Sequence, residues 1–308
     1  MNKVPPKAVL PKQTTDLSET SLHFAIPKGR MHQGVIALLA DAGIHLKQTA
    51  RNYRPVISLS GVEVKVLKPQ NVVEMLHVGT RDCGFAGADW VAELEADVVE
   101  VFDTELDAVG LVVAAPTEIL VDGRLPDTSP LGGPLRVAAE MPRIAQQWID
   151  RACPKARLVR TFGATEVFPP EDADCILDIA ATGATLRANG LTIVDEVMRS
   201  STRLYASHAA MKDDAKRARI EGLVALLRGV LEGRRRVMME INIGPDSLEA
   251  LVDILPCMHR PTVASLFGEA GYAVKAAVPK TEVPDLIPRI KAVGGSDIVV
   301  SPLAQVLP

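Results

Sequence analysis

The stretch from Asp174 to Leu186 restricts the fold of this 308-residue chain more than any other. The residues between Asp174 and Asp178 are apolar and predict a short buried strand. A loop of small residues follows at 180–185, and Leu186 then opens a short helical run that ends near Gly190. Strands that alternate with helices pack in layers, so this unit predicts an α/β fold.

The loop after this strand has the chemistry of a phosphate cradle. Small side chains let a polyanion approach the backbone, and N–H groups at a loop-to-helix junction attract anions. The hydroxyls of Thr182 and Thr185 add donors, and the carboxylate of Asp178 suits sugar hydroxyls or water-bound Mg²⁺. The pattern therefore predicts a grip on a ribose 5-phosphate. The same spacing also fits a structural strand–turn–helix in which Thr182 or Thr185 caps the helix.

Two cations follow the first predicted strand. Residues 22–26 alternate in polarity and predict a strand, and apolar residues from Met31 onward recur at helical spacing. Lys28 and Arg30 therefore lie at the carboxyl end of a strand, where α/β sheets bind ligands. A phosphate site and a solvated loop both fit this segment.

A second strand end of this kind lies at residues 81–90. This run predicts a short buried strand that leads into a Gly-x-Asp turn, and Gly84 and Gly87 allow another group to approach the backbone closely. Asp89 fits two roles, a cap on the helix expected from Trp90 and a polar group that faces a ligand.

The composition argues against several functions. The net charge is −4 and aromatic residues make up 4%, which disfavours nucleic-acid binding. No apolar run reaches the ~18 residues of a membrane helix, and residues 1–21, expected to form a flexible tail or strap, contain no secretory signal. The four cysteines are scattered without C-x-x-C spacing, which indicates reduced thiols and a cytoplasmic location.

The remaining chain predicts further layers and a separable last unit. Residues 111–115 and 135–139 predict strands on either side of a Pro- and Gly-rich loop, and residues 142–152 predict a helix. Residues 211–231 form an amphipathic helical pattern. From residue 236 the predicted order is strand, helix, two strands, helix and strand, which is ferredoxin-like. Such a unit fits a structural role, an oligomer contact or a small-molecule sensor.

Several motifs together resemble the ATP phosphoribosyltransferases. They are Pro-Lys-Gly-Arg ending at Arg30, Gly-x-x-Gly-x-Asp ending at Asp89, and the whole run from Gly163 to Leu204. The resemblance covers residues 22–302. It implies an enzyme that joins N1 of the adenine of ATP to C1 of 5-phosphoribosyl 1-pyrophosphate and releases pyrophosphate, in the first step of L-histidine biosynthesis. It also implies a two-lobed core like that of periplasmic binding proteins, followed by an ACT-like, ferredoxin-like regulatory domain.

The resemblance assigns site residues by motif, and no general base is among them. The implied ligands of 5-phosphoribosyl 1-pyrophosphate are Glu166, Asp178, Thr182, Gly183, Ala184, Thr185 and Leu186. Those of ATP or its phosphates are Lys28, Gly29, Arg30, Lys68, Gly87 and Asp89. Mg²⁺ is the implied cofactor, held by Asp178 and Glu166. Two features depart from the family: Lys68 alone stands for a basic-Asp-Ile-Pro motif, and a glycine-rich Cys-Arg loop is missing at residues 104–110.

The long form of the family implies feedback inhibition by histidine and a homo-hexamer. Thr262, Ala277, Ser296 and Asp297 would line the histidine pocket. The expected division is a tail at 1–21, lobe I at 22–112 and 194–230, lobe II at 113–193, and a regulatory domain at 231–308. A phosphoribosyltransferase with another nucleophile and a non-catalytic two-lobed binding subunit stay open as alternatives.

Overall fold

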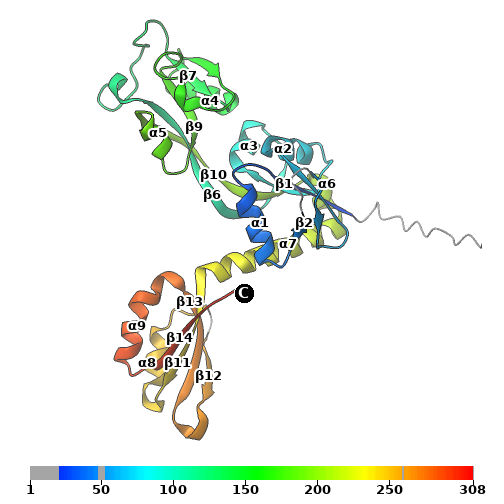
Figure 1. Ribbon diagram of the computed structural model, residues 1–308, viewed down its shortest axis with the longest axis vertical. Helices are drawn as coiled ribbons and strands as arrows, with labels where there is room; N and C mark the ends of the chain where they lie inside the picture. The colour runs from blue at the N-terminus through cyan, green and yellow to red at the C-terminus, as the bar shows by residue number, and fades with distance from the viewer. Residues whose placement is uncertain (1–20, 48–52, 259, 308) are drawn as a thin grey trace, which may run out of the picture.

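The computed structural model describes residues 21–47, 53–258 and 260–307. One eight-stranded sheet, in the order β4-β1-β5-β10-β6-β9-β7-β8, runs through two lobes (Figure 1). A separate four-stranded sheet forms the carboxy-terminal domain. In the described ranges, none of the helices combines the length and the apolar character that crossing a bilayer requires.

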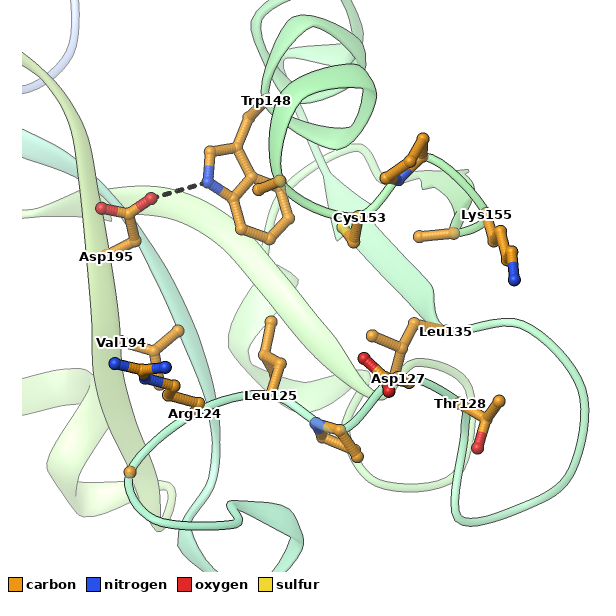
Figure 2. Close-up of a pocket in the computed structure, with 15 residues that line it drawn as sticks. Arg124, Leu125, Asp127, Thr128, Leu135, Trp148, Cys153, Lys155, Val194 and Asp195 are labelled. Carbon is orange, nitrogen blue, oxygen red and sulfur yellow. Dashed lines mark hydrogen bonds between the residues drawn. The ribbon is translucent and has the colours of Figure 1, made fainter.

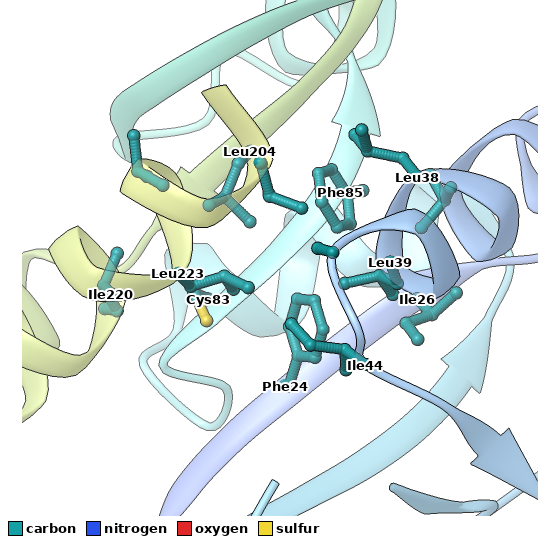
Figure 3. Packing of buried hydrophobic residues seen from close by; sticks show 14 of the residues in the cluster. Phe24, Ile26, Leu38, Leu39, Ile44, Cys83, Phe85, Leu204, Ile220 and Leu223 are labelled. Carbon is teal, nitrogen blue, oxygen red and sulfur yellow. The ribbon is translucent and has the colours of Figure 1, made fainter. Parts of the chain in front are cut away.

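Lobe I is built on three parallel strands. Its larger core lies on the sheet face that α1 and α7 cover, where the rings of Phe24 and Phe85 lie 5.7 Å apart (Figure 3). The strands are close-packed because Gly84 has no side chain: an added Cβ would lie 2.8 Å from the Cβ of Ala25. The elements of lobe I are β1 (Leu22–Pro27), α1 (His32–Asp41), β2 (Leu46–Lys47), β3 (Val56–Ile57), β4 (Val62–Leu67), α2 (Pro69–His77), β5 (Cys83–Gly87), α3 (Ala88–Glu93), α6 (His208–Lys212) and α7 (Asp214–Arg235).

The helix predicted over residues 211–231 is two helices in the structure. α6 ends at Lys212, and the side chain of Asp213 then accepts hydrogen bonds from the N–H groups of Ala215 and Lys216 to start α7. The apolar periodicity continued through this break, so it did not reveal the capping aspartate.

Lobe II repeats the parallel pattern on the other half of the sheet. β7 lies between β8 and β9 and is parallel to both, and a second apolar core surrounds Trp148 of α4. The elements are η1 (Thr117–Ile119), β7 (Arg136–Ala139), α4 (Pro142–Ala152), β8 (Arg157–Arg160), η2 (Thr165–Val167), β9 (Cys175–Ala180) and α5 (Ala184–Ala188).

Two long antiparallel strands join the lobes, and the sequence predicted only part of one of them. β6 (Val99–Pro116) has 18 residues and β10 (Leu191–Ala206) has 16. Their pairing shifts register at five places, so the ribbon carries bulges that interrupt the alternation of apolar and polar residues. The buried residues of β6 are 104, 109 and 111–116, and the last run includes the segment that was predicted as a strand.

The carboxy-terminal domain has the predicted ferredoxin-like order. Its sheet is ordered β12-β13-β11-β14, and the residues of α8 and α9 that face it fill the core. The elements are β11 (Arg236–Ile243), η3 (Pro245–Ser247), α8 (Leu248–Ile254), β12 (Thr262–Ser265), η4 (Phe267–Glu269), β13 (Tyr272–Pro279), η5 (Lys280–Glu282), α9 (Val283–Ala292) and β14 (Ser296–Pro302).

After β14 the chain returns to α7. The N–H of Val306 donates to the carbonyl of Gly229 at 2.8 Å, and the amide of Gln305 donates to the carbonyl of Asp41 at 3.1 Å. Gly229 and Gly233 make room for this segment, since a Cβ on Gly233 would lie 2.9 Å from the carbonyl oxygen of Ala304. The domain is therefore attached to lobe I both by α7 and by the returning segment.

Candidate functional site

The sheet brings the predicted ATP-binding residues to one edge of lobe I. Pro27 of β1 pairs with Leu67 of β4, so Lys28 and Lys68 follow at the same level. Ala25 pairs with Gly84 of β5, which places Gly87 beside Lys28 three residues later. Neighbouring strands lie about 4.8 Å apart, and this register gathers two cations and a glycine at the carboxyl ends of three parallel strands.

A strained turn in β6 holds Arg30. The Nη1 group of Arg30 donates to the carbonyl of Asp107 at 2.9 Å. Asp107 has φ of 50° and Glu105 has φ of 58°, both in the left-handed region. The hydroxyl of Thr202 donates to the carboxylate of Asp107 at 2.9 Å and stabilises the turn. This turn occupies the segment in which the glycine-rich Cys-Arg loop is missing.

Asp89 is buried beside Gly87. Its side chain accepts a hydrogen bond from the N–H of Trp90 at 2.8 Å, and its own N–H donates to Ser200 at 3.1 Å. Burial raises the pKa of Asp89, while these hydrogen bonds and the charge of Arg30 oppose the rise. The helix begins two residues earlier than predicted, with Gly87 as its N-cap residue, so Asp89 lies in the first turn and is not the cap.

Replacement of Gly87 by alanine should destabilise this edge. The new Cβ would lie 2.0 Å from Oδ1 of Asp89, so the buried carboxylate would have to leave its hydrogen bond. We expect the free energy of unfolding to fall by about 2–3 kcal/mol, measured by urea denaturation. The control is Gly222→Ala on α7, where no atom lies within 4 Å of the new Cβ and alanine should be neutral or stabilising. An unchanged midpoint for Gly87→Ala would contradict the packing described.

Three carboxylates meet at the corresponding edge of lobe II. Ala139 of β7 pairs with Leu177 of β9, which places Glu140 beside Asp178. Burial raises the pKa of Asp178 to about 6, and the charges of Glu166 and Glu140 add to the rise, while the N–H of Ile179 opposes it. Glu166 comes from η2, which begins after Ala164 in the left-handed region. The edge is thus acidic where the edge of lobe I is basic.

The loop after Asp178 encloses a cavity of about 280 Å³. The cavity is lined by all seven residues that were predicted to bind 5-phosphoribosyl 1-pyrophosphate, together with Ile179, Ala180 and Ala181. Gly183 is buried with φ of 68° and forms the N-cap of α5. The hydroxyl of Thr182 accepts from the N–H of Ala184 at 3.3 Å, so Thr182 orders the turn and neither threonine is the N-cap residue.

The backbone of this loop offers donors to an anion. Among the described residues, no hydrogen-bond acceptor lies opposite the N–H groups of Ala181, Thr182 or Gly183. Thr182, Ala184 and Thr185 are exposed to solvent. Unpaired N–H groups at the start of a helix form an anion site, so this unit has the geometry of a phosphate cradle.

Family models and named relatives decide the family. The model described as "ATP phosphoribosyltransferase" matches residues 68–229, and the model described as "HisG, C-terminal domain" matches residues 233–305. The ATP phosphoribosyltransferase of Pelotomaculum thermopropionicum is 34% identical over 292 residues, which cover 93% of this chain and 99% of the relative. That of Desulforudis audaxviator is 33% identical with the same coverage. The chain belongs to the ATP phosphoribosyltransferase family.

A solved structure agrees with this membership. The ATP phosphoribosyl transferase (HisG:HisZ) complex from Thermotoga maritima contains a chain that is 25% identical, with a TM-score of 0.59. The match covers 68% of the present chain and 98% of that chain. Together with the family models, it confirms the predicted two-lobed core, and the second model confirms the carboxy-terminal domain.

One carboxylate at this edge of lobe II was missed from the sequence. Glu140 directly follows a strand that was predicted correctly, and the strands on either side end at the same edge of the sheet. The signal was therefore its position after β7, whereas the motifs drew attention to Glu166 and Asp178.

The assignment of Mg²⁺ to Asp178 and Glu166 stays a prediction. The described residues contain no group of three or more His, Cys, Asp or Glu side chains that could hold a metal ion directly. Mg²⁺ commonly keeps several waters and binds through one or two carboxylates and the phosphates of its substrate. Asp178 with Glu166 fits that mode.

The predicted histidine-binding residues divide into two groups within one chain. Thr262 of β12 pairs with Lys275, two residues from Ala277 on β13. Ser296 pairs with Asn242 at the other end of β11, and the Asn242 side chain donates to Asp297 at 3.0 Å. Ala277 pairs with Met238, four residues from Asn242, so about 13 Å of strand separates Ala277 from the level of Ser296.

A larger cavity, of about 680 Å³, lies elsewhere in lobe II (Figure 2). Trp148, Leu135 and the loop around Leu125 line it, and the indole N–H of Trp148 donates to Asp195 at 2.8 Å. None of the predicted site residues lines this cavity.

Proposed function

We propose that the chain condenses ATP with 5-phosphoribosyl 1-pyrophosphate to give N1-(5-phosphoribosyl)-ATP and pyrophosphate, the first step of L-histidine biosynthesis. The observation that carries the proposal is the cradle of residues 180–185 beside Asp178, on a chain of this family. In the reaction, N1 of adenine forms a bond to C1 of the ribose, and the bond from C1 to pyrophosphate breaks.

Lobe II would bind the phosphoribosyl group. The N–H groups of Thr182 and Gly183 and the hydroxyl of Thr185 would hold the 5-phosphate, and Asp178 would accept hydrogen bonds from the ribose hydroxyls. A carboxylate near C1 also favours the positive charge that develops on the ribose as pyrophosphate departs. When bound, Mg²⁺ would neutralise the pyrophosphate, and Asp178 with Glu166 would hold it through water.

Lobe I would bind ATP. Lys28, Arg30 and Lys68 lie at one edge of the sheet and would face phosphates, with Gly29 and Gly87 allowing close approach. The ring of Tyr53 lies 5.6 Å from the Lys28 ammonium and helps to position it. The protein then acts by positioning two substrates and balancing their charges, and we assign no side chain as a general base.

The remaining proposals concern assembly and regulation. Histidine would bind the carboxy-terminal domain through Thr262, Ala277, Ser296 and Asp297 and inhibit the enzyme, which would assemble as a hexamer. All four cysteines are free thiols, which supports a cytoplasmic location. The domain boundaries predicted above stay proposals, and that at residue 231 falls inside α7, where Leu231 packs with lobe I.

The test is an assay of the full chain with ATP, 5-phosphoribosyl 1-pyrophosphate and Mg²⁺. We expect an adduct that absorbs in the ultraviolet and pyrophosphate release that depends on ATP, and we expect added histidine to suppress both. Adduct formation that histidine does not affect would overturn only the regulatory proposal. Pyrophosphate release without adduct would indicate another nucleophile, and binding without release would indicate a regulatory binding subunit.

A further inference from the structure

The carboxylate of Glu93 connects the two lobes. Glu93 is the last residue of α3 in lobe I, and its side chain is buried. It accepts hydrogen bonds from the N–H of Arg143 at 3.0 and 3.1 Å and from that of Ile144 at 3.0 Å, both in the first turn of α4 in lobe II. α4 has no cap from its own chain segment, so a residue of the other lobe caps it.

The hydrogen bonds from α4 to Glu93 join two segments that lie only a few residues from the two edges of the site. Asp89 occupies the first turn of α3, and Glu93 is one helical turn further on. Glu140, which neighbours Asp178, lies three residues before Arg143. The contact between α3 and α4 therefore sets the spacing between a residue of the basic edge and a residue of the acidic edge.

The two strands that cross between the lobes, β6 and β10, would by themselves hold the lobes less firmly than they are held together with the Glu93 contact. β6 and β10 cross between them as a two-stranded ribbon, and its register shifts at five places. Bulged strands bend more readily than regular ones, and a two-stranded ribbon is only marginally stable by itself. A buried carboxylate with three charge-assisted hydrogen bonds supplies a constraint that the ribbon lacks.

Other contacts surround the Glu93 contact without replacing it. Trp90 of α3 packs against the apolar cores of both lobes. Glu95 forms an ion pair with the guanidinium of Arg143 at 2.6 Å, but both side chains are well exposed, so the pair contributes little. The second tryptophan, Trp148, lies in the middle of α4, and its indole N–H donates to Asp195 of β10.

We propose that Glu93 is a positioning residue for the reaction, which sets the separation between the ATP-binding edge and the phosphoribosyl-binding edge. The inference rests on the proposed function. The cradle for 5-phosphoribosyl 1-pyrophosphate lies wholly within lobe II, so binding of this substrate alone does not depend on the connection. Transfer to ATP needs both edges and does depend on it.

The test compares Glu93→Gln and Glu93→Ala with the control Glu95→Gln, all in the full chain. For Glu93→Ala we expect kcat for adduct formation to fall at least tenfold, while Kd for 5-phosphoribosyl 1-pyrophosphate, measured by calorimetry without ATP, changes less than threefold. Glu93→Gln keeps one acceptor oxygen in the same volume, so its kcat should be intermediate and its fold intact. Glu95→Gln should stay within twofold of the unchanged protein in both measurements.

Tryptophan fluorescence gives a readout that does not need activity. Trp90 packs against the cores of both lobes, whereas Trp148 is buried in the core of lobe II, and we expect acrylamide to quench Trp90 more strongly in Glu93→Ala. Unchanged kcat and unchanged quenching in both Glu93 variants would overturn the proposal. Equal losses of kcat and of affinity for 5-phosphoribosyl 1-pyrophosphate, in proportion to a loss of folded protein, would also overturn it. An unchanged protein that forms no adduct would instead contradict the proposed function.

Discussion

Asp178→Asn should lower kcat/KM for 5-phosphoribosyl 1-pyrophosphate by about 10²–10³-fold and at the same time make the free protein more stable at neutral pH. The loss of activity follows from removing the charge that would face the ribose and Mg²⁺. The gain in stability follows from the position of the carboxylate, which is partly buried next to Glu140 and Glu166. Steady-state kinetics and thermal melts without Mg²⁺ measure the two effects.

The direction of the stability effect follows from proton linkage. The folded-state pKa of Asp178 is raised from 3.8 to about 6, so the folded protein holds this proton more tightly than the unfolded chain. Stability contributed by the protonated carboxyl is present below about pH 4 and is lost as the pH rises through about 6. The remaining solvent contact of Asp178 reduces the penalty above pH 6 to about 1–2 kcal/mol.

Asparagine carries no charge, so the variant should melt a few degrees higher than the unchanged protein at pH 8 and no higher at pH 4. Asp172→Asn, at an exposed position in the segment before β9, is the matched control and should show neither effect. A melting curve of Asp178→Asn that keeps the same pH dependence as the unchanged protein would show that Asp178 is not the group that titrates.

Gly183→Val should weaken binding of 5-phosphoribosyl 1-pyrophosphate by at least about 100-fold. Gly183 has φ of 68°, which a β-branched residue adopts only with strain. Its Cβ would also lie 3.1 Å from Nη1 of Arg187 and 3.3 Å from Cδ1 of Ile193, so the loop would move and its N–H groups would lose their alignment. Calorimetry with the substrate and Mg²⁺ measures the affinity.

The control for backbone strain is Gly123→Val. Gly123 has φ of 75° and no atom lies within 4 Å of its added Cβ, and it belongs to a loop that does not line the cradle. This variant should lose some stability without losing affinity. If Gly183→Val bound the substrate as tightly as Gly123→Val, residues 180–185 would not be the phosphate cradle.

The parts of the fold that follow local rules were predictable from the sequence. β1, β5 and β9 are short, apolar and bounded by turn residues, so all three were predicted, and the predicted ends of β1 and β9 lie within one or two residues of those observed. The turn at residues 180–185 was also predictable, because small residues with a glycine at the position of positive φ leave a local signature. The ferredoxin-like order of the last domain followed from the same kind of pattern.

The missed features depend on partners that are distant in the sequence. β6 and β10 are long because each pairs with the other, and their bulges remove the alternation that predicts a strand. Glu140 joins the site through strand order, and Glu93 caps a helix that begins about fifty residues later. No single-sequence signal identifies the partner of such a residue, since register and lobe packing are properties of the tertiary structure.

The return of residues 303–307 to α7 has a mechanical consequence for the carboxy-terminal domain. A domain that hangs from a single helix can rotate about the helix axis, whereas one with two attachments resists that rotation. Here α7 leads out, and the returning segment is fixed at Gly229, Gly233 and Asp41. A torque on the domain would therefore act on α7, whose other face lies against the core of lobe I through Ile220, Leu223 and Leu227.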